Sequence, residues 1–131
     1  MNAKQRITHP AVAEPPAGTW SNCLVVGEQI FTAGIAARDG ATILAEDEYG
    51  QAKAIFEKIA ALLDAAGAQM DDIVKLVIYV TDISRREEVW RARCEFFSEP
   101  FPVSTLVEAR ALALPELKVE IEAIAIRGAG G

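Results

Sequence analysis

The sequence has few of the residues that build metal sites or bind nucleic acids. It contains one histidine, His9, and two cysteines, Cys23 and Cys94, which lie far apart and without CxxC spacing. Because zinc sites need clustered Cys and His side chains, we expect no metal site and two reduced thiols. Only 13 Lys and Arg residues oppose 19 Asp and Glu residues, giving a formal charge of -6. This balance argues against nucleic acid and against an anionic membrane surface as partners, since both carry negative charge.

Long apolar segments are also missing. Residues 1–10 lack the apolar centre of a signal peptide, and no stretch reaches the ~20 apolar residues of a membrane span. We therefore expect a cytoplasmic protein. The chain does have sufficient length and apolar content for a core, with 131 residues of which 51% are hydrophobic. These values predict a single domain over residues 1–131, stable without disulfides or metals.

Two segments have apolar residues at the three-and-four spacing of a helix. In residues 47–66 the apolar positions share one helical face, and Gly67 follows as a typical C-terminal residue. The second helix is predicted to begin with a capping box formed by Ser84 and Glu87 and to continue until Pro100. Along it, arginines alternate with glutamates, which predicts a salt-bridged solvent face rather than an anion site. These residues are Arg85, Arg86, Glu87, Glu88, Arg91, Arg93 and Glu95.

The remaining apolar segments are typical of strands. An edge strand is expected at residues 5–8, followed by a Pro-rich loop over 9–18. Cys23–Val26 and residues 29–35 flank Gly27-Glu28, a two-residue turn that predicts a type II′ hairpin. Further strands are predicted at Ile73–Val80, 103–109 and 117–126, the last with alternating apolar and charged positions. This order predicts an α+β fold in which two helices cover one face of the sheet.

The strand at Ile73–Val80 also predicts the character of the opposite face of the sheet. Only Lys75 interrupts its apolar residues, so apolar side chains are expected on both faces. Since the two helices can cover one face only, we expect the other face to be buried against further copies of the chain.

Several motifs are similar to those of one protein family. Phe101-Pro102, Leu106-Val107-Glu108 and residues 118–125 resemble the C-terminal signature of the RidA/YjgF family. Residues 18–20, 30–34, 72–75 and 80–82 follow the family's order and spacing, so the resemblance covers almost the whole chain. It implies a chorismate-mutase-like α+β fold, with a six-stranded mixed sheet and two helices on one face. It also implies a homotrimer with a central barrel and three clefts between subunits.

The resemblance further implies a chemistry. Members of the deaminase branch of this family hydrolyse 2-iminoacids, or their enamine tautomers, to a 2-ketoacid and ammonia without metal or cofactor. A cofactor-free hydrolase or deaminase acting on a small metabolite in a cleft between subunits is therefore expected. The resemblance assigns Glu120 as the catalytic residue that holds the attacking water. The residues that it implies for substrate binding are Trp20, Thr32, Ala33, Gly34, Trp90, Ser104 and Leu106.

Ser104 departs from the family pattern. The deaminases carry at this position an arginine that binds the substrate carboxylate through two charge-assisted hydrogen bonds, which a hydroxyl cannot replace. The chain thus resembles branches of the family that lack the arginine, and an anionic substrate is disfavoured. Arg110 shares strand parity with Ser104 and is a candidate replacement if the strand continues that far; otherwise it is an exposed partner of Glu108. Trp90, near a position where the deaminases have Asn, implies a more apolar pocket.

Other interpretations of the same residues stay open. Glu120 is also explained as a solvated carboxylate beside Lys118, and Trp20 as an anchor that packs the Pro-rich loop onto the core. For the whole protein, the alternative function is a non-catalytic regulatory trimer that binds a metabolite. A third function, ribonuclease or translation inhibitor as described for some family members, is disfavoured by the acidic charge.

Overall fold

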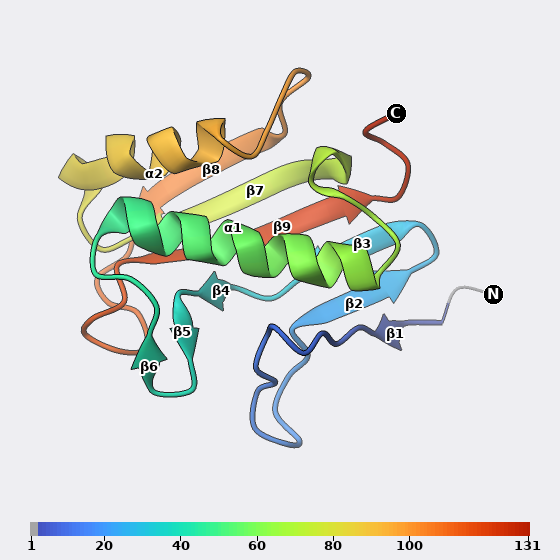
Figure 1. Cartoon of the computed structure of the whole chain (residues 1–131), viewed down its shortest axis with the longest axis horizontal. Coiled ribbons are helices and arrows are strands. Elements are labelled where there is room, and N and C mark those ends of the chain that lie inside the picture. The colour runs from blue at the N-terminus through green and yellow to red at the C-terminus, as the bar shows by residue number, and fades with distance from the viewer. Residues whose placement is uncertain (1–2) are drawn as a thin grey trace.

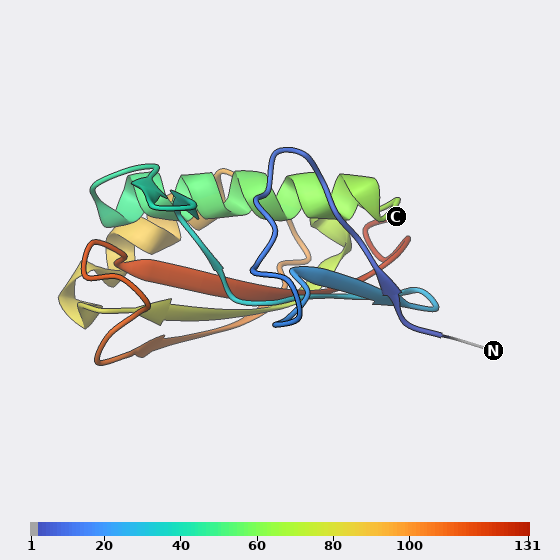
Figure 2. The same cartoon turned by 90° about the horizontal axis from the view of Figure 1, so that it is seen from below.

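The computed structural model describes residues 3–131, which form one main sheet with both helices on the same side (Figures 1 and 2). The strand order is β1-β2-β3-β9-β7-β8, and β4 pairs with β9 beyond the end of β3. The strands are β1 (Gln5–Arg6), β2 (Cys23–Val26), β3 (Gln29–Thr32), β4 (Ile35–Ala36), β7 (Ile73–Val80), β8 (Val103–Glu108) and β9 (Val119–Ile126). A separate small sheet joins β5 (Arg38–Asp39) to β6 (Thr42–Ile43). The helices are α1 (Glu48–Ala65) and α2 (Arg86–Cys94), each next to a short 3₁₀ helix, η1 (Met70–Asp72) and η2 (Ile83–Arg85).

The predicted α+β class is confirmed, and the sheet is mixed because β8 runs parallel to β7 while β7 and β9 are antiparallel. The sheet has seven strands rather than the predicted six, since the segment expected as one strand over residues 29–35 is split into β3 and β4. The pairs Phe31–Ile124 and Ile35–Ile121 leave one extra residue between these two strands. In that gap, Thr32 Oγ1 accepts a hydrogen bond from a backbone N–H of β9 (3.0 Å) in place of the regular ladder.

Both ends of α1 lie within a residue of the predicted bounds. Asp47 caps its start, since Asp47 Oδ1 accepts a hydrogen bond from the N–H of Gly50 (2.7 Å). At the other end Ala66 is the capping residue, and Gly67 follows with a φ of +77°, a conformation that favours glycine.

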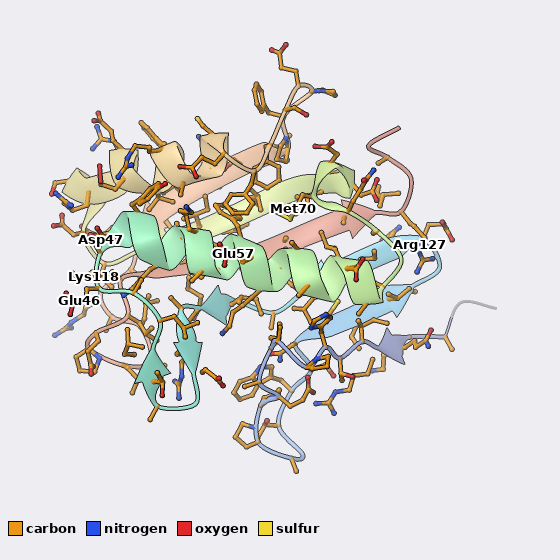
Figure 3. The ribbon with its side chains drawn as sticks, in the orientation of Figure 1. Glu46, Asp47, Glu57, Met70, Lys118 and Arg127 are labelled. Atoms are coloured by element: carbon orange, nitrogen blue, oxygen red, sulfur yellow. The ribbon has the colours of Figure 1, made fainter. Side chains whose placement is uncertain are left out.

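Arg127 ties the end of α1 to the β2–β3 hairpin. Its guanidinium donates twice to the carbonyl of Ala66 (2.7 and 3.1 Å) and once to the carbonyl of Gly27 (3.3 Å). Figure 3 shows Arg127 at the end of β9 beside this hairpin. The turn is as predicted: Gly27 has a φ of +61° and Glu28 a negative one, the combination of a type II′ turn.

The second helix differs from the prediction at both ends. Ser84 forms no capping box with Glu87, because its N–H and its hydroxyl both donate to Asp82 Oδ1 (3.0 and 2.6 Å) within η2. With the hydroxyl used as a donor, α2 begins only after η2. It ends at Cys94 rather than near residue 100, since the following Phe96 and Phe97 rings pack against a phenylalanine of α1, with ring centroids 5.2 and 5.5 Å away.

The core lies between the helices and the sheet. On β9 the alternation predicted from the sequence is confirmed, since Val119, Ile121, Ala123 and Ala125 are all buried. The intervening Glu120, Glu122 and Ile124 share the uncovered face with Lys75, Val77 and Tyr79 of β7. This face is therefore mixed, apolar in part and charged in part. Within residues 3–131, no helix combines the length and the apolar character needed to cross a bilayer.

Candidate functional site

A cleft of about 510 Å³ lies beside β4, between the N-terminal loop and the start of β9. Residues 12–16, Trp20 and Asn22 line it from the loop, and Arg38 and Lys58 line it from the side of β5 and α1. Gly34 and Glu120 are also part of the lining. Figure 1 shows how the N-terminal loop comes to lie beside β4 and β5 after leaving β1. The structure thus brings together three of the predicted site residues, Trp20, Gly34 and Glu120.

Glu120 is the carboxylate of this cleft. It is half-buried, and its pKa is raised, first by burial and then by the negative charge of Glu122. The hydroxyl of Tyr79 donates to Glu122 Oε1 (2.6 Å). A carboxylate with a raised pKa in a partly dry cleft is suited to accept a proton from water and to return it later.

The segment at residues 32–34 reaches the cleft through Gly34 alone. Thr32 is buried, and its hydroxyl donates to the Ala33 carbonyl (2.9 Å). The N–H of Ala33 donates to the carbonyl of Asn22 (2.8 Å), which joins this segment to the N-terminal loop. Thr32 and Ala33 therefore shape the wall of the cleft from behind, and a direct contact with a ligand is open only at Gly34.

Trp20 lies at the mouth of the cleft with 55% of its surface exposed. An indole that anchored the loop onto the core would be mostly covered. The geometry is that of a lining residue, with an apolar surface available to a ligand.

Two cations line the same cleft. Lys58 of α1 donates to the carbonyl of Ala36 (3.0 Å) and to that of Arg38, so its ammonium holds β4 and β5 against the helix. Burial lowers the pKa of Lys58, an effect that the charge of Asp39 opposes. The guanidinium of Arg38 in turn donates to the carbonyl of Gly40 (2.7 Å).

The other predicted residues lie elsewhere in the chain. Ser104 and Leu106 are on β8, which is separated from β9 by β7, and Trp90 is on α2. None of the three lines the cleft around Glu120. The hydroxyl of Ser104 accepts a hydrogen bond from Arg93 Nη1 (2.8 Å). In a single chain, the predicted site is thus divided between two edges of the sheet.

The proposed role of Arg110 depended on the strand continuing through it. β8 ends at Glu108, and Arg110 is exposed in a bend beyond that end, so the alternation does not carry it next to Ser104. Glu108 itself accepts a hydrogen bond from the N–H of Ile83 (2.9 Å). The cation beside Ser104 comes from α2 instead.

A sequence model of the family described as endoribonuclease L-PSP matches residues 11–127. The chain belongs to this RidA/YjgF family. The RutC family protein of Pyrococcus abyssi is 34% identical over 117 residues, which cover 88% of this chain and 91% of that protein. The 2-iminobutanoate/2-iminopropanoate deaminase of Salmonella typhimurium is 36% identical over 106 residues, which cover 78% of this chain and 82% of that protein. A solved structure of a Pseudomonas aeruginosa protein of unknown function has a TM-score of 0.90 at 41% identity and covers 98% of this chain and 95% of that one.

The sequence of this RidA/YjgF chain also contains a pattern that could have identified Lys58 as a residue of the cleft. It lies three residues after Ile55 and four before Leu62, both fully buried, so it is a charged residue on the apolar face of α1. Such a lysine must find acceptors, and it finds the carbonyls of the β4–β5 segment. Within residues 3–131 no group of three or more His, Cys, Asp or Glu side chains is arranged to hold a metal ion.

Proposed function

We propose that this RidA/YjgF protein hydrolyses a small imine or enamine to a carbonyl compound and ammonia, with Glu120 as the base that activates water. The observation that carries the proposal is the half-buried Glu120 carboxylate, with its raised pKa, in a cleft beside the exposed indole of Trp20. A relative at 36% identity carries the name 2-iminobutanoate/2-iminopropanoate deaminase, which is consistent with this chemistry.

The reaction needs both protons of the attacking water to be removed in turn. Water adds to the carbon of the protonated C=N bond while Glu120 takes a proton from the water, and a carbinolamine forms. Glu120 then gives that proton to the nitrogen, the C–N bond breaks and ammonia leaves. The hydroxyl proton of the carbinolamine passes to Glu120 as the carbonyl forms, and Glu120 releases it to the departing ammonia. A carboxyl group with a raised pKa serves both steps, since its protonated and ionised forms lie closer in free energy at neutral pH. The iminium carbon is itself electrophilic, so the proposal requires no cofactor.

The proposal includes a homotrimer, because only an assembly can join the two halves of the predicted site. Val103 of β8 and the neighbouring Phe101 are 66% and 61% exposed along the edge that carries Ser104. Packing this edge against the cleft of another copy would cover these apolar side chains and place Ser104, Leu106 and Trp90 near the other copy's Glu120.

Size-exclusion chromatography with light scattering tests this assembly. We expect a trimer for the natural chain and a smaller species for Val103→Asp. A charge at this exposed position costs the isolated chain little, so loss of assembly would not reflect unfolding. Leu44→Asp is the matched control, since Leu44 is 44% exposed but lies outside this edge. A monomeric natural chain would contradict the assembly.

Ammonia release from a panel of enamines and iminoacids tests the reaction itself. Glu120→Ala and Glu120→Gln should reduce kcat by at least about a hundredfold, the usual contribution of a general base. Glu57→Ala is the control, because Glu57 is exposed on the outer side of α1 (Figure 3). Turnover that is indifferent to both Glu120 variants would disprove the assigned role.

Binding measurements on the same protein distinguish two other functions from the proposed hydrolysis. A regulatory trimer would be stabilised thermally by a metabolite without turning it over. The family description names an endoribonuclease, but a chain with a formal charge of -6 is poorly suited to bind a phosphate backbone. Measurable affinity for RNA at moderate salt would reverse this ranking.

A further inference from the structure

The cleft that contains Glu120 has a positively charged end. Arg38, at the start of β5, and Lys58 of α1 both line this cleft. Neither side chain has a carboxylate oxygen within 4.0 Å among residues 3–131. Glu14, the other acidic residue of the lining, is already paired with Arg6 (2.5 Å). Although the chain has a formal charge of -6, this end of the cleft therefore carries two cations without a carboxylate partner.

Both cations retain hydrogen-bond donors for a ligand. An ammonium group has three N–H donors, and Lys58 uses two of them on the carbonyls of Ala36 and Arg38. A guanidinium has five, and Arg38 uses one of them on the carbonyl of Gly40. The remaining donors of the two side chains are available to an anion in the cleft.

The surroundings of Lys58 favour a negatively charged ligand. Burial lowers the pKa of Lys58; the charge of Asp39 opposes this effect, and the charge of Arg38 adds to it. The two cations are thus close enough to repel each other in a partly desolvated place. An anion bound to both would compensate the buried charge and relieve the repulsion.

We propose that Arg38 and Lys58 bind a carboxylate of the substrate that is separated from the reacting carbon by several other carbon atoms. This inference rests on the proposed function and specifies its substrate class as imines or enamines that carry such a remote carboxylate. The sequence disfavoured an anionic substrate because of Ser104, whereas these two cations come from α1 and β5.

The position of β4 explains why the carboxylate must be remote. Lys58 reaches the carbonyl of Ala36 (3.0 Å) from the side of α1, and Ala36 pairs with Glu120, whose side chain lies on the uncovered face of the sheet. The carboxylate and Glu120 would therefore lie on opposite sides of β4, with their negative charges apart. Because neighbouring strands are about 4.8 Å apart, a spacer of a few carbon atoms has to join the two ends of the ligand.

The cleft has room and lining for such a spacer. Its volume of about 510 Å³ is within the usual range of small-molecule sites. Apolar side chains line it between the polar groups, and they are Val12, Pro15, Pro16 and Leu117. A chain of methylene groups would bury apolar surface against them.

The local charge favours a carboxylate over a phosphate group. Arg38 and Lys58 contribute two positive charges, and the neighbouring Asp39 contributes one negative charge. The net charge of this end is thus about +1, which one carboxylate neutralises and a phosphate dianion would exceed.

Equilibrium binding of three matched probes tests the inference. The probes are 5-oxohexanoate, its uncharged amide 5-oxohexanamide, and the isomer 2-oxohexanoate, whose carboxylate is next to the ketone. They contain no C=N bond, so titration calorimetry with the full chain measures binding without turnover. We expect 5-oxohexanoate to bind about tenfold or more tightly than the amide, the value of one charge-assisted hydrogen bond, and more tightly than 2-oxohexanoate.

Two variants and one control assign this preference to the cations. Arg38→Gln and Lys58→Gln should each weaken 5-oxohexanoate about tenfold and leave the amide unchanged. Glutamine at position 58 retains N–H donors for the backbone carbonyls that Lys58 holds. Lys53→Gln is the control, because Lys53 lies on the same helix, outside the cleft and beside Glu95 (3.6 Å), and it should change neither affinity.

The outcomes separate this inference from the proposed reaction. A natural chain without a preference for 5-oxohexanoate over the amide would overturn the inference, and so would Arg38→Gln weakening both probes alike. Equal affinity for 2-oxohexanoate would overturn the remote position of the carboxylate. A preference that depends on Arg38, without ammonia release from any imine, would leave the inference standing and would count against the proposed reaction alone.

Discussion

The carboxylate of Glu120 lies against the backbone of Gly34, in space that any larger residue at position 34 would occupy. A Cβ atom built on Gly34 would be 2.8 Å from Glu120 Cδ and 3.1 Å from Glu120 Cγ. Both distances are shorter than the optimal separation of carbon atoms. Gly34 also lies in the bulge between β3 and β4. The interruption of the strand and the position of the carboxylate are therefore linked.

We expect Gly34→Ala to reduce kcat for ammonia release about tenfold or more, because the added methyl group displaces the carboxylate from its position. The Glu120 side chain can rotate into the cleft, so the free energy of unfolding should fall by no more than about 1 kcal/mol. Steady-state kinetics and urea denaturation measure the two effects.

A double-mutant cycle separates this contact from other effects of the methyl group. In the Glu120→Ala background the methyl group added at position 34 meets no carboxylate, so Gly34→Ala should then cost nothing in unfolding free energy. An equal cost in both backgrounds would show that Gly34 acts through some other neighbour.

The pH dependence of the reaction should respond to Glu122. Its negative charge is the second cause of the raised pKa of Glu120, after burial. Glu122→Gln removes that charge, so the pKa of Glu120 should fall and the acid limb of the kcat/KM profile should move to lower pH. Rates measured between about pH 4 and pH 8 with the two proteins side by side would show the displacement. An acid limb that stays in place would mean that it reports another group.

The ionised carboxylate of Glu120 should also lower the stability of the folded protein at neutral pH. Its folded-state pKa is raised above the unfolded value, so the folded state holds the proton more tightly and stability falls as pH rises through that interval. Glu120→Gln should therefore raise the free energy of unfolding at neutral pH. Well below the usual pKa of a glutamate, where the carboxyl is protonated in both states, the advantage should vanish. A variant that is less stable than the natural chain at neutral pH would contradict this account.

Most of the fold follows from periodicity in the sequence. The alternation of apolar residues along β9 and their three-and-four spacing along α1 each place apolar side chains on one face. Both faces are buried in the structure. The predicted cap at Ser84 failed because a nearer carboxylate, that of Asp82, takes both donors of the serine. The strand over residues 29–35 was split, and there the N–H of Ala123 donates to the Thr32 hydroxyl in place of one backbone hydrogen bond between the strands. Both differences come from local side-chain competition, which a hydrophobic pattern does not register.

The site was less accessible from the sequence. Glu120, Gly34 and Trp20 were identified by resemblance to the family, and they meet in one cleft. Arg93 was interpreted as part of a solvent face because arginines and glutamates alternate along this helix. Its partner is Ser104, eleven residues away on another element, and only the packing of α2 against β8 brings the two together.

Gln51 is a fully buried polar residue that positions the segment leading to Glu120. Its side-chain amide donates to the carbonyls of Ala45 (3.1 Å) and Glu116 (2.9 Å), and its oxygen accepts from the N–H of Lys118 (2.8 Å). Three backbone groups, one before α1 in the sequence and two after it, therefore have their hydrogen-bond partner in this one side chain. Lys118 directly precedes β9, so these bonds fix where that strand begins.

We expect Gln51→Ala to lower the free energy of unfolding by about 3 kcal/mol, because it leaves a cavity and removes the partner of three backbone polar groups. Urea denaturation at neutral pH measures the loss. Gln29→Ala is the matched control, since Gln29 is exposed on β3, and its effect should stay within about 0.5 kcal/mol. Gln51→Glu retains the acceptor for Lys118 but loses both donors and buries a charge, so it should be at least as destabilising as alanine. If Gln51→Ala cost no more than Gln29→Ala, the start of β9 would have to be held by its neighbours in the sheet rather than by this amide.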